Sequence, residues 1–91
     1  MDQILVMWVK VWRPLNDFEK KIVKCLSKHG NMSWSDLNSK LGMSQSTLSK
    51  YLRVLQDKGI LVYYNKEYSL QDLMLEIWLN HQKEKYGVYP I

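Results

Sequence analysis

The sequence of 91 residues has little cysteine, proline or glycine: one Cys, two Pro and four Gly. A single thiol, Cys25, excludes an intramolecular disulfide and any site built on paired thiols, and it is typical of a reducing compartment. The scarcity of Pro and Gly and the apolar share of 46%, with four Trp and six Tyr, argue against disorder. We therefore expect one folded cytoplasmic domain without an internal linker.

A long hydrophobic run is also missing. The most apolar stretch, residues 4–12, covers nine residues with Lys10 inside it, and Asp2 rather than a basic segment precedes it. A membrane helix needs about 20 apolar residues, and a signal peptide needs a basic start and a small-residue cleavage site. We expect neither, and therefore no membrane partner.

Motifs for catalysis or metal binding are absent as well. The sequence has no nucleophile elbow, no phosphate-cradling glycine loop and no suitably spaced carboxylate pair, so we predict no enzyme and no catalytic residue. Cys25 and His29 have i, i+4 spacing, but both fall on a predicted core stripe and no second thiol exists. We predict no metal site and no cofactor.

Charge is unevenly distributed along the chain, whose net charge is +4. Between Lys20 and Lys66 there are nine basic and two acidic residues, whereas both flanking segments are slightly acidic. A basic middle segment favours a surface that faces a polyanion, although solvated helix faces produce the same pattern.

Capping signals predict three helices in this middle segment. Asn16 with Glu19 resembles a capping box and opens a helix that ends at Gly30 and Asn31. Ser33 opens a short second helix ending at Gly42. Its predicted inward residues are Leu37 and Leu41. The predicted core stripe of the first helix is Phe18, Ile22, Cys25, Leu26 and His29, with Lys20, Lys24 and Lys28 opposite.

The third helix begins at Ser44, whose hydroxyl can cap the amide of Thr47, and runs to about Lys58. Leu48, Leu52 and Leu55 form its predicted core stripe. Only residues 42–44 separate it from the second helix, so the two helices must cross steeply, as in a helix-turn-helix.

Beyond Gly59 the apolar period changes to that of strands. Residues 60–64 alternate, Asn65 and Lys66 form a tight turn, and residues 67–70 return as a second strand. Met32 can pack as a staple or form a one-residue bridge to a strand. The predicted fold is mainly α with a small β-hairpin (α+β), a winged helix-turn-helix with extra N- and C-terminal helices.

Residues 15–70 resemble the winged helix-turn-helix domain of the ArsR/MarR-like bacterial and archaeal regulators. The resemblance is carried by "LNDFEKKIVKCL", "MSWSDLNSKLGMSQSTLSKYLRVLQDKGIL" and "LVYYNKEYSL". It implies a DNA-binding transcription regulator whose third helix reads the major groove and whose hairpin, the wing, contacts the backbone. The short wing has one basic residue at its tip, unlike longer wings with several, which makes reading of the minor groove doubtful.

The predicted DNA-binding residues follow from this reading. Gln can bond adenine, Lys and Arg can reach guanine or phosphate, and a helix N-terminus favours phosphate. Tyr51 either stacks on a sugar-phosphate or packs beside the wing. A merely solvated helix face is the alternative to DNA contact. The predicted set is Ser44, Gln45, Ser46, Thr47, Ser49, Lys50, Arg53 and Lys66.

The two ends of the chain carry more apolar surface than one small core needs. Residues 1–13 form an apolar segment, predicted as helix although a strand is possible. Residues 70–86 form a terminal helix with one stripe at positions 70, 73, 74, 77, 78 and 81 and a second at 75 and 79. We predict a homodimer through these ends on a palindromic double-stranded site. The apolar residues could instead cover one another within a monomer.

Two other functions fit the same pattern. A winged helix can be a protein-interaction module whose apolar ends bind a partner, and it can be a non-specific nucleic-acid binder. Salt-dependent binding to one DNA site over bulk DNA separates the three readings.

Overall fold

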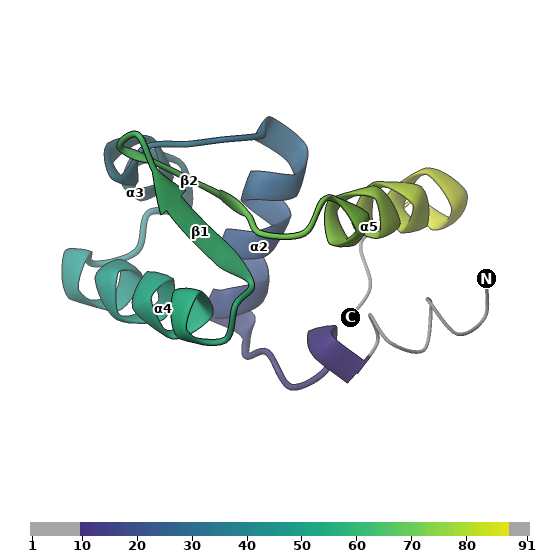
Figure 1. Ribbon diagram of the computed structural model, residues 1–91, viewed down its shortest axis with the longest axis horizontal. Coiled ribbons are helices and arrows are strands. Elements are labelled where there is room, and N and C mark those ends of the chain that lie inside the picture. The colour runs from purple at the N-terminus through teal and green to yellow at the C-terminus, as the bar shows by residue number, and fades with distance from the viewer. Residues whose placement is uncertain (1–9, 88–91) are drawn as a thin grey trace.

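The structure is a computed structural model that describes residues 10–87, with the backbone alone at positions 73 and 74. It is mainly helical with a two-stranded antiparallel hairpin, which confirms the predicted fold class (Figure 1). Residues 10–12 are helical, and the predicted structure of residues 1–9 lies outside the described residues. The elements are α2 (Asp17–His29), α3 (Trp34–Leu41), α4 (Gln45–Asp57), β1 (Leu61–Tyr64), β2 (Glu67–Leu70) and α5 (Leu73–Tyr86).

The three predicted N-caps are confirmed. Asn16 and Glu19 form a reciprocal capping box: the Glu19 amide donates to Asn16 Oδ1 at 2.8 Å, and the Asn16 amide donates to Glu19 Oε1 at 3.2 Å. Glu19 is buried, and its second oxygen accepts from Lys58 Nζ at 2.9 Å. The carboxylate thereby fixes the start of α2 to the end of α4.

The turn between α3 and α4 depends on Gly42. It caps α3 with φ 65° in the left-handed region, which glycine enters without a steric penalty. Met43 then packs against the core, and Ser44 caps α4. Residues 42–44 thus form the whole connection between the two helices, as predicted.

The hairpin pairs Leu61 with Leu70 and Tyr64 with Glu67, and residues 65 and 66 form its turn. Met32, between α2 and α3, adds a one-residue bridge to Tyr68: each amide donates to the other residue's carbonyl, at 3.0 and 2.7 Å. The bridge predicted as one alternative for Met32 is confirmed, and it attaches the hairpin to the helical part.

The turn itself gives a testable prediction. Asn65 and Lys66 both have positive φ, 53° and 66°, as a type I′ turn requires. Because a left-handed conformation costs a residue with a Cβ more than it costs glycine, Lys66→Gly should raise the free energy of unfolding by about 0.5–1 kcal/mol. Urea denaturation measures it. Lys66→Ala removes the same charge without relieving the backbone, and an equal gain in that variant would contradict the explanation.

The core gathers residues from α2, α3, α4, β1 and α5 and from the segment before α2, and the partly buried Tyr68 and Leu70 of β2 pack against it. Trp12 and Leu15 lie in it, although they precede the first capped helix. Ser27 and Asn80 join α2 to α5, with Ser27 Oγ donating to Asn80 Oδ1 at 3.0 Å. The other buried apolar residues are Ile22, Val23, Leu26, Met32, Leu37, Leu48, Leu52, Leu55, Ile60, Leu61, Leu75, Trp78 and Leu79.

Two predicted stripes need correction. On α2, Phe18 is 42% exposed and His29 is exposed, while Val23 and Ser27 are buried instead, so the buried face is rotated from the predicted one. On α5, Trp78 is buried together with Leu75 and Leu79, whereas Ile77 and His81 of the same predicted stripe are exposed. Because α5 packs on α2 and β2, the structure divides a stripe that sequence spacing had grouped.

Helix α5 and the wing lie at opposite ends of the molecule. In Figure 1, α5 extends at one end, whereas α3, the start of α4 and the tip of the hairpin lie at the other. Within residues 10–87, no helix is both long and apolar enough to cross a membrane.

Candidate nucleic-acid interface

Helix α4 has one buried and one exposed face. Leu48, Leu52 and Leu55 are at most 1% exposed and hold the helix against the core. Five of the predicted contact residues lie on the other side of this helix with exposed side chains: Gln45, Ser46, Ser49, Lys50 and Arg53. The leucine face fixes the position of α4, so the polar face is presented on a rigid support.

The start of α4 is organised by its own cap. The Thr47 amide donates to Ser44 Oγ at 3.3 Å, and the Ser44 hydroxyl donates to Thr47 Oγ1 at 2.7 Å. Ser44 and the half-buried Thr47 therefore satisfy each other, and their side chains set the geometry of the helix start. The amides of Gln45 and Ser46 remain available for an anion, because the first amides of a helix lack intrahelical acceptors.

Trp34 is a residue of this surface that sequence reasoning missed. It begins α3, is half-buried, and its indole N–H donates to Ser49 Oγ at 3.2 Å. The hydrogen bond joins the start of α3 to the polar face of α4. A tryptophan after the capping Ser33 is visible in the sequence, but its partner on another helix is not.

Tyr51 of α4 contacts α2. Its ring stacks on Phe18 of α2, with centroids 5.4 Å apart and planes inclined by 14°. Lys50 Nζ lies 5.3 Å from the Tyr51 ring, and Lys21 Nζ lies 6.0 Å from the Phe18 ring. Cation–π contacts at these distances orient the ammonium groups beside exposed aromatic surface. Neither alternative considered for Tyr51 anticipated the contact with Phe18.

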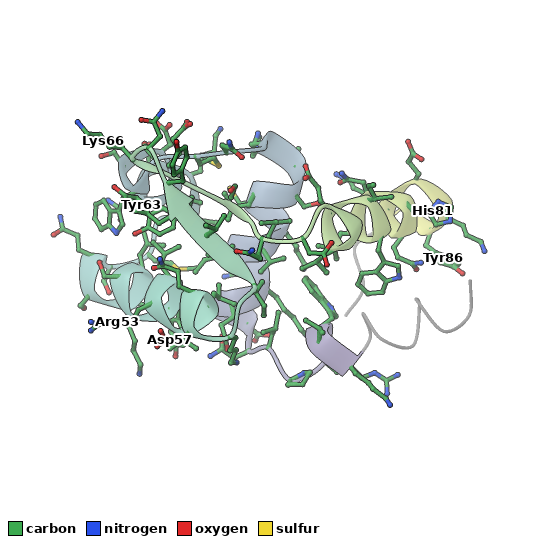
Figure 2. All side chains as sticks on the ribbon, in the orientation of Figure 1. Arg53, Asp57, Tyr63, Lys66, His81 and Tyr86 are labelled. Atoms are coloured by element: carbon green, nitrogen blue, oxygen red, sulfur yellow. The ribbon has the colours of Figure 1, made fainter. Side chains whose placement is uncertain are left out.

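The wing presents its charge at the tip of the hairpin. Figure 2 shows Lys66 at that tip and Arg53 on α4, both at the end of the molecule opposite His81 and Tyr86 of α5. Lys66 is exposed, as is Tyr64, of which 80% is accessible. The structure thus brings α4 and the wing tip to one end of the molecule. Ser44 and Thr47 form the N-terminal cap of α4.

Cys25 and His29 do not form part of a larger ligand cluster. Among residues 10–87, no group of three or more His, Cys, Asp and Glu side chains could hold a metal ion. Cys25 is half-buried, and its Sγ lies 3.5 Å from Met32 Sδ. Burial raises the pKa of the thiol above its ordinary 9.0, against the opposing influence of Lys40 and Lys28.

The raised pKa predicts slow alkylation of Cys25. The thiol stays protonated at neutral pH, and only the thiolate is nucleophilic. The iodoacetamide reaction should be slower than in the urea-unfolded chain, with an apparent pKa above 9.0. Because the pKa of the thiol is higher in the folded than in the unfolded chain, the protonated thiol stabilises the fold. This contribution to the free energy of unfolding is complete below the unfolded pKa and is lost as pH rises through the folded pKa. An apparent pKa of 9.0 or lower in the folded protein would contradict the prediction.

Comparison with known proteins identifies this architecture. The family model described as "Winged helix-turn-helix DNA-binding" matches residues 15–62, from the start of the core to the first strand of the hairpin. No curated protein sequence matches the chain.

One solved structure similar to this chain is the crystal structure of Pseudomonas aeruginosa HmgR. It shares 27% sequence identity, the TM-score is 0.59, and the matched region covers 75% of this chain and 30% of that chain. The chain therefore corresponds to less than a third of HmgR. Because the family model covers more than half of the 91 residues, the chain belongs to the winged helix-turn-helix DNA-binding family.

Proposed function

We propose that the protein is a sequence-specific, double-stranded DNA-binding transcription regulator that places α4 in the major groove and the wing on the DNA backbone. The observation that carries the proposal is the division of α4 into a fully buried leucine face and an exposed polar face. The major groove of B-DNA admits a helix, and side chains at its N-terminal end reach base edges.

Each predicted residue has a chemical role in this proposal. Gln45 can form two hydrogen bonds with adenine, and Arg53 can form two with guanine or hold a phosphate. Lys50 supplies a charge to the backbone, and Ser46 lies where the free amides of the helix start favour a phosphate. Lys66 contacts a phosphate from the wing, which positions the protein without reading sequence. Ser44, Thr47 and Ser49 act mainly through the cap and the bond to Trp34.

DNA selected from a random pool provides the direct test. The affinity for the selected duplex is then compared with that for a scrambled duplex over a series of salt concentrations. The proposal predicts a preference of at least about 10³ for the selected site and a linear fall of log affinity with log salt. Binding without discrimination would indicate a non-specific nucleic-acid binder. No binding would favour a protein-interaction module.

We further propose a homodimer formed through the N- and C-terminal segments, residues 1–13 and 70–86. Ile77 is 50% exposed and Tyr86 is 62% exposed on α5, so apolar surface remains at the end opposite the wing. Small domains bury a modest fraction of their surface and gain from association. A two-fold dimer would set its two α4 helices about 34 Å apart and bind a palindromic site.

Light scattering tests the dimer without DNA. At micromolar concentration we expect twice the chain mass of 10.9 kDa. Ile77→Glu should shift the protein towards the monomer, because a carboxylate would then have to be buried at the interface. Gln56→Glu adds the same charge at an exposed position of α4 and should leave the mass unchanged. A monomer mass for the unaltered chain would reject the dimer.

A further inference from the structure

A second basic surface lies on α2 and α3. An open groove of about 370 Å³ lies between α2 and α3. Four lysines line it, three from α2 and one from α3, together with Cys25 and His29: Lys21, Lys24, Lys28 and Lys40. No acidic residue is among the groups that line this groove.

The lysines line one groove although their charges repel one another. Lys24 and Lys28 have i, i+4 spacing on α2, at which like charges destabilise a helix. Within the described part of the chain, neither Lys28 nor Lys40 has a carboxylate in salt-bridge distance; the acidic Glu19 is bonded to Lys58 instead. Repulsion of this kind is relieved when an anion enters between the ammonium groups.

The neighbouring helix ends do not cancel this charge. Both α2 and α3 end beside the groove, and each C-terminus contributes about half a negative charge. Together they offset about one positive charge, fewer than Lys21, Lys28 and Lys40 supply, so the groove remains positive. Lysine ammonium groups are compact point charges suited to phosphate and carboxylate oxygens.

We propose that this groove between α2 and α3 binds a small polyanion, a free molecule carrying two or more phosphate or carboxylate groups. Lys28 and Lys40 hold the anion from the two helices, and Cys25 forms part of the wall. The groove is lined by α2 and α3, whereas the residues proposed to contact DNA belong to α4 and the wing. The binding is measured without DNA, so its test does not depend on the proposed DNA-binding function.

Inorganic pyrophosphate is the probe. Calorimetric titration of the full chain at low salt should show saturable binding, and the double variant Lys28→Gln/Lys40→Gln should weaken it about tenfold or more through the loss of two nearby charges. Both lysines are exposed, so the variant should fold, which circular dichroism checks. The matched control, Lys10→Gln/Arg13→Gln, removes two exposed charges before the start of α2 and should change the affinity less than twofold.

Cys25 supplies a second readout, because it is the only thiol in the chain. Pyrophosphate should slow the reaction of Cys25 with uncharged iodoacetamide, with half-protection at the concentration that half-saturates the calorimetric signal. Absence of saturable binding, equal weakening in the two double variants, or unprotected Cys25 would each overturn the proposal. A random-sequence DNA duplex could also displace pyrophosphate, and Lys28→Gln/Lys40→Gln could lose as much affinity for DNA as for pyrophosphate. These two results together would assign the groove to nucleic acid and overturn the proposal.

Discussion

Replacement of Leu52 by alanine is expected to lower the free energy of unfolding by about 2–5 kcal/mol. Leu52 is 1% exposed at the centre of the leucine face of α4, between Leu48 and Leu55, and its removal leaves a cavity in the core. Domains of this size are stable by about 5–15 kcal/mol, so the loss is a large share of the total. Urea denaturation followed by circular dichroism measures it.

The matched control for Leu52→Ala is Gln56→Ala. Gln56 is exposed on the same helix, and both glutamine and alanine have good helix propensity. It should change stability by no more than about 0.5 kcal/mol. The folded fraction of Leu52→Ala should keep the DNA preference of the unaltered protein, because Leu52 faces away from the polar surface. A loss below about 1 kcal/mol would show that α4 is not held by this face.

Arg53→Ala alters the residue next to Leu52, but it is expected to affect DNA binding and not stability. Arg53 is exposed, so its removal should leave the free energy of unfolding within about 0.5 kcal/mol. If it bonds a guanine, binding to the selected duplex should weaken by about 1–3 kcal/mol and the site preference should relax. If it holds a phosphate, binding should weaken on every sequence and the salt slope should fall by about one. Fluorescence anisotropy across salt concentrations distinguishes the two roles.

Two controls accompany the Arg53 measurement. Lys85→Ala removes one positive charge from exposed α5, at the end opposite the wing, and should leave affinity almost unchanged at physiological salt. Gln45→Ala should reduce the site preference, whereas Gln56→Ala near the other end of α4 should not. Unchanged DNA binding in both Arg53→Ala and Gln45→Ala would reject α4 as the reading helix.

The local elements could be predicted because their signals act over a few residues. Asn16, Ser33 and Ser44 each cap an amide within three residues, and Gly42 ends α3 through its own backbone conformation. The hairpin turn at Asn65 and Lys66 is equally local. These features depend on nearby atoms, so the sequence contains their physical cause.

The orientation of helix faces depends on tertiary contacts instead. Phe18 has helical spacing with Ile22, yet it stacks on Tyr51 at the surface because α4 crosses α2 there. Apolar residues surround much of α5, so spacing alone could not decide that Trp78 turns inward and Ile77 outward. The bond from Trp34 to Ser49 likewise requires the crossing of α3 and α4. The candidate DNA contacts could be chosen from the pattern of α4 and the hairpin turn. The contacts between helices that hold them in place could not.

The pair of hydrogen bonds between Met32 and Tyr68 has a consequence for folding. A two-stranded hairpin alone is at best marginal in water, and this bridge closes a chain loop that contains all of α3 and α4. The entropic cost of closing this loop is offset only when both helices have packed. The wing should therefore become ordered late and together with them. Helix α4 and the wing are thereby placed in one cooperative unit, so we expect that neither unfolds locally while the other keeps its full stability.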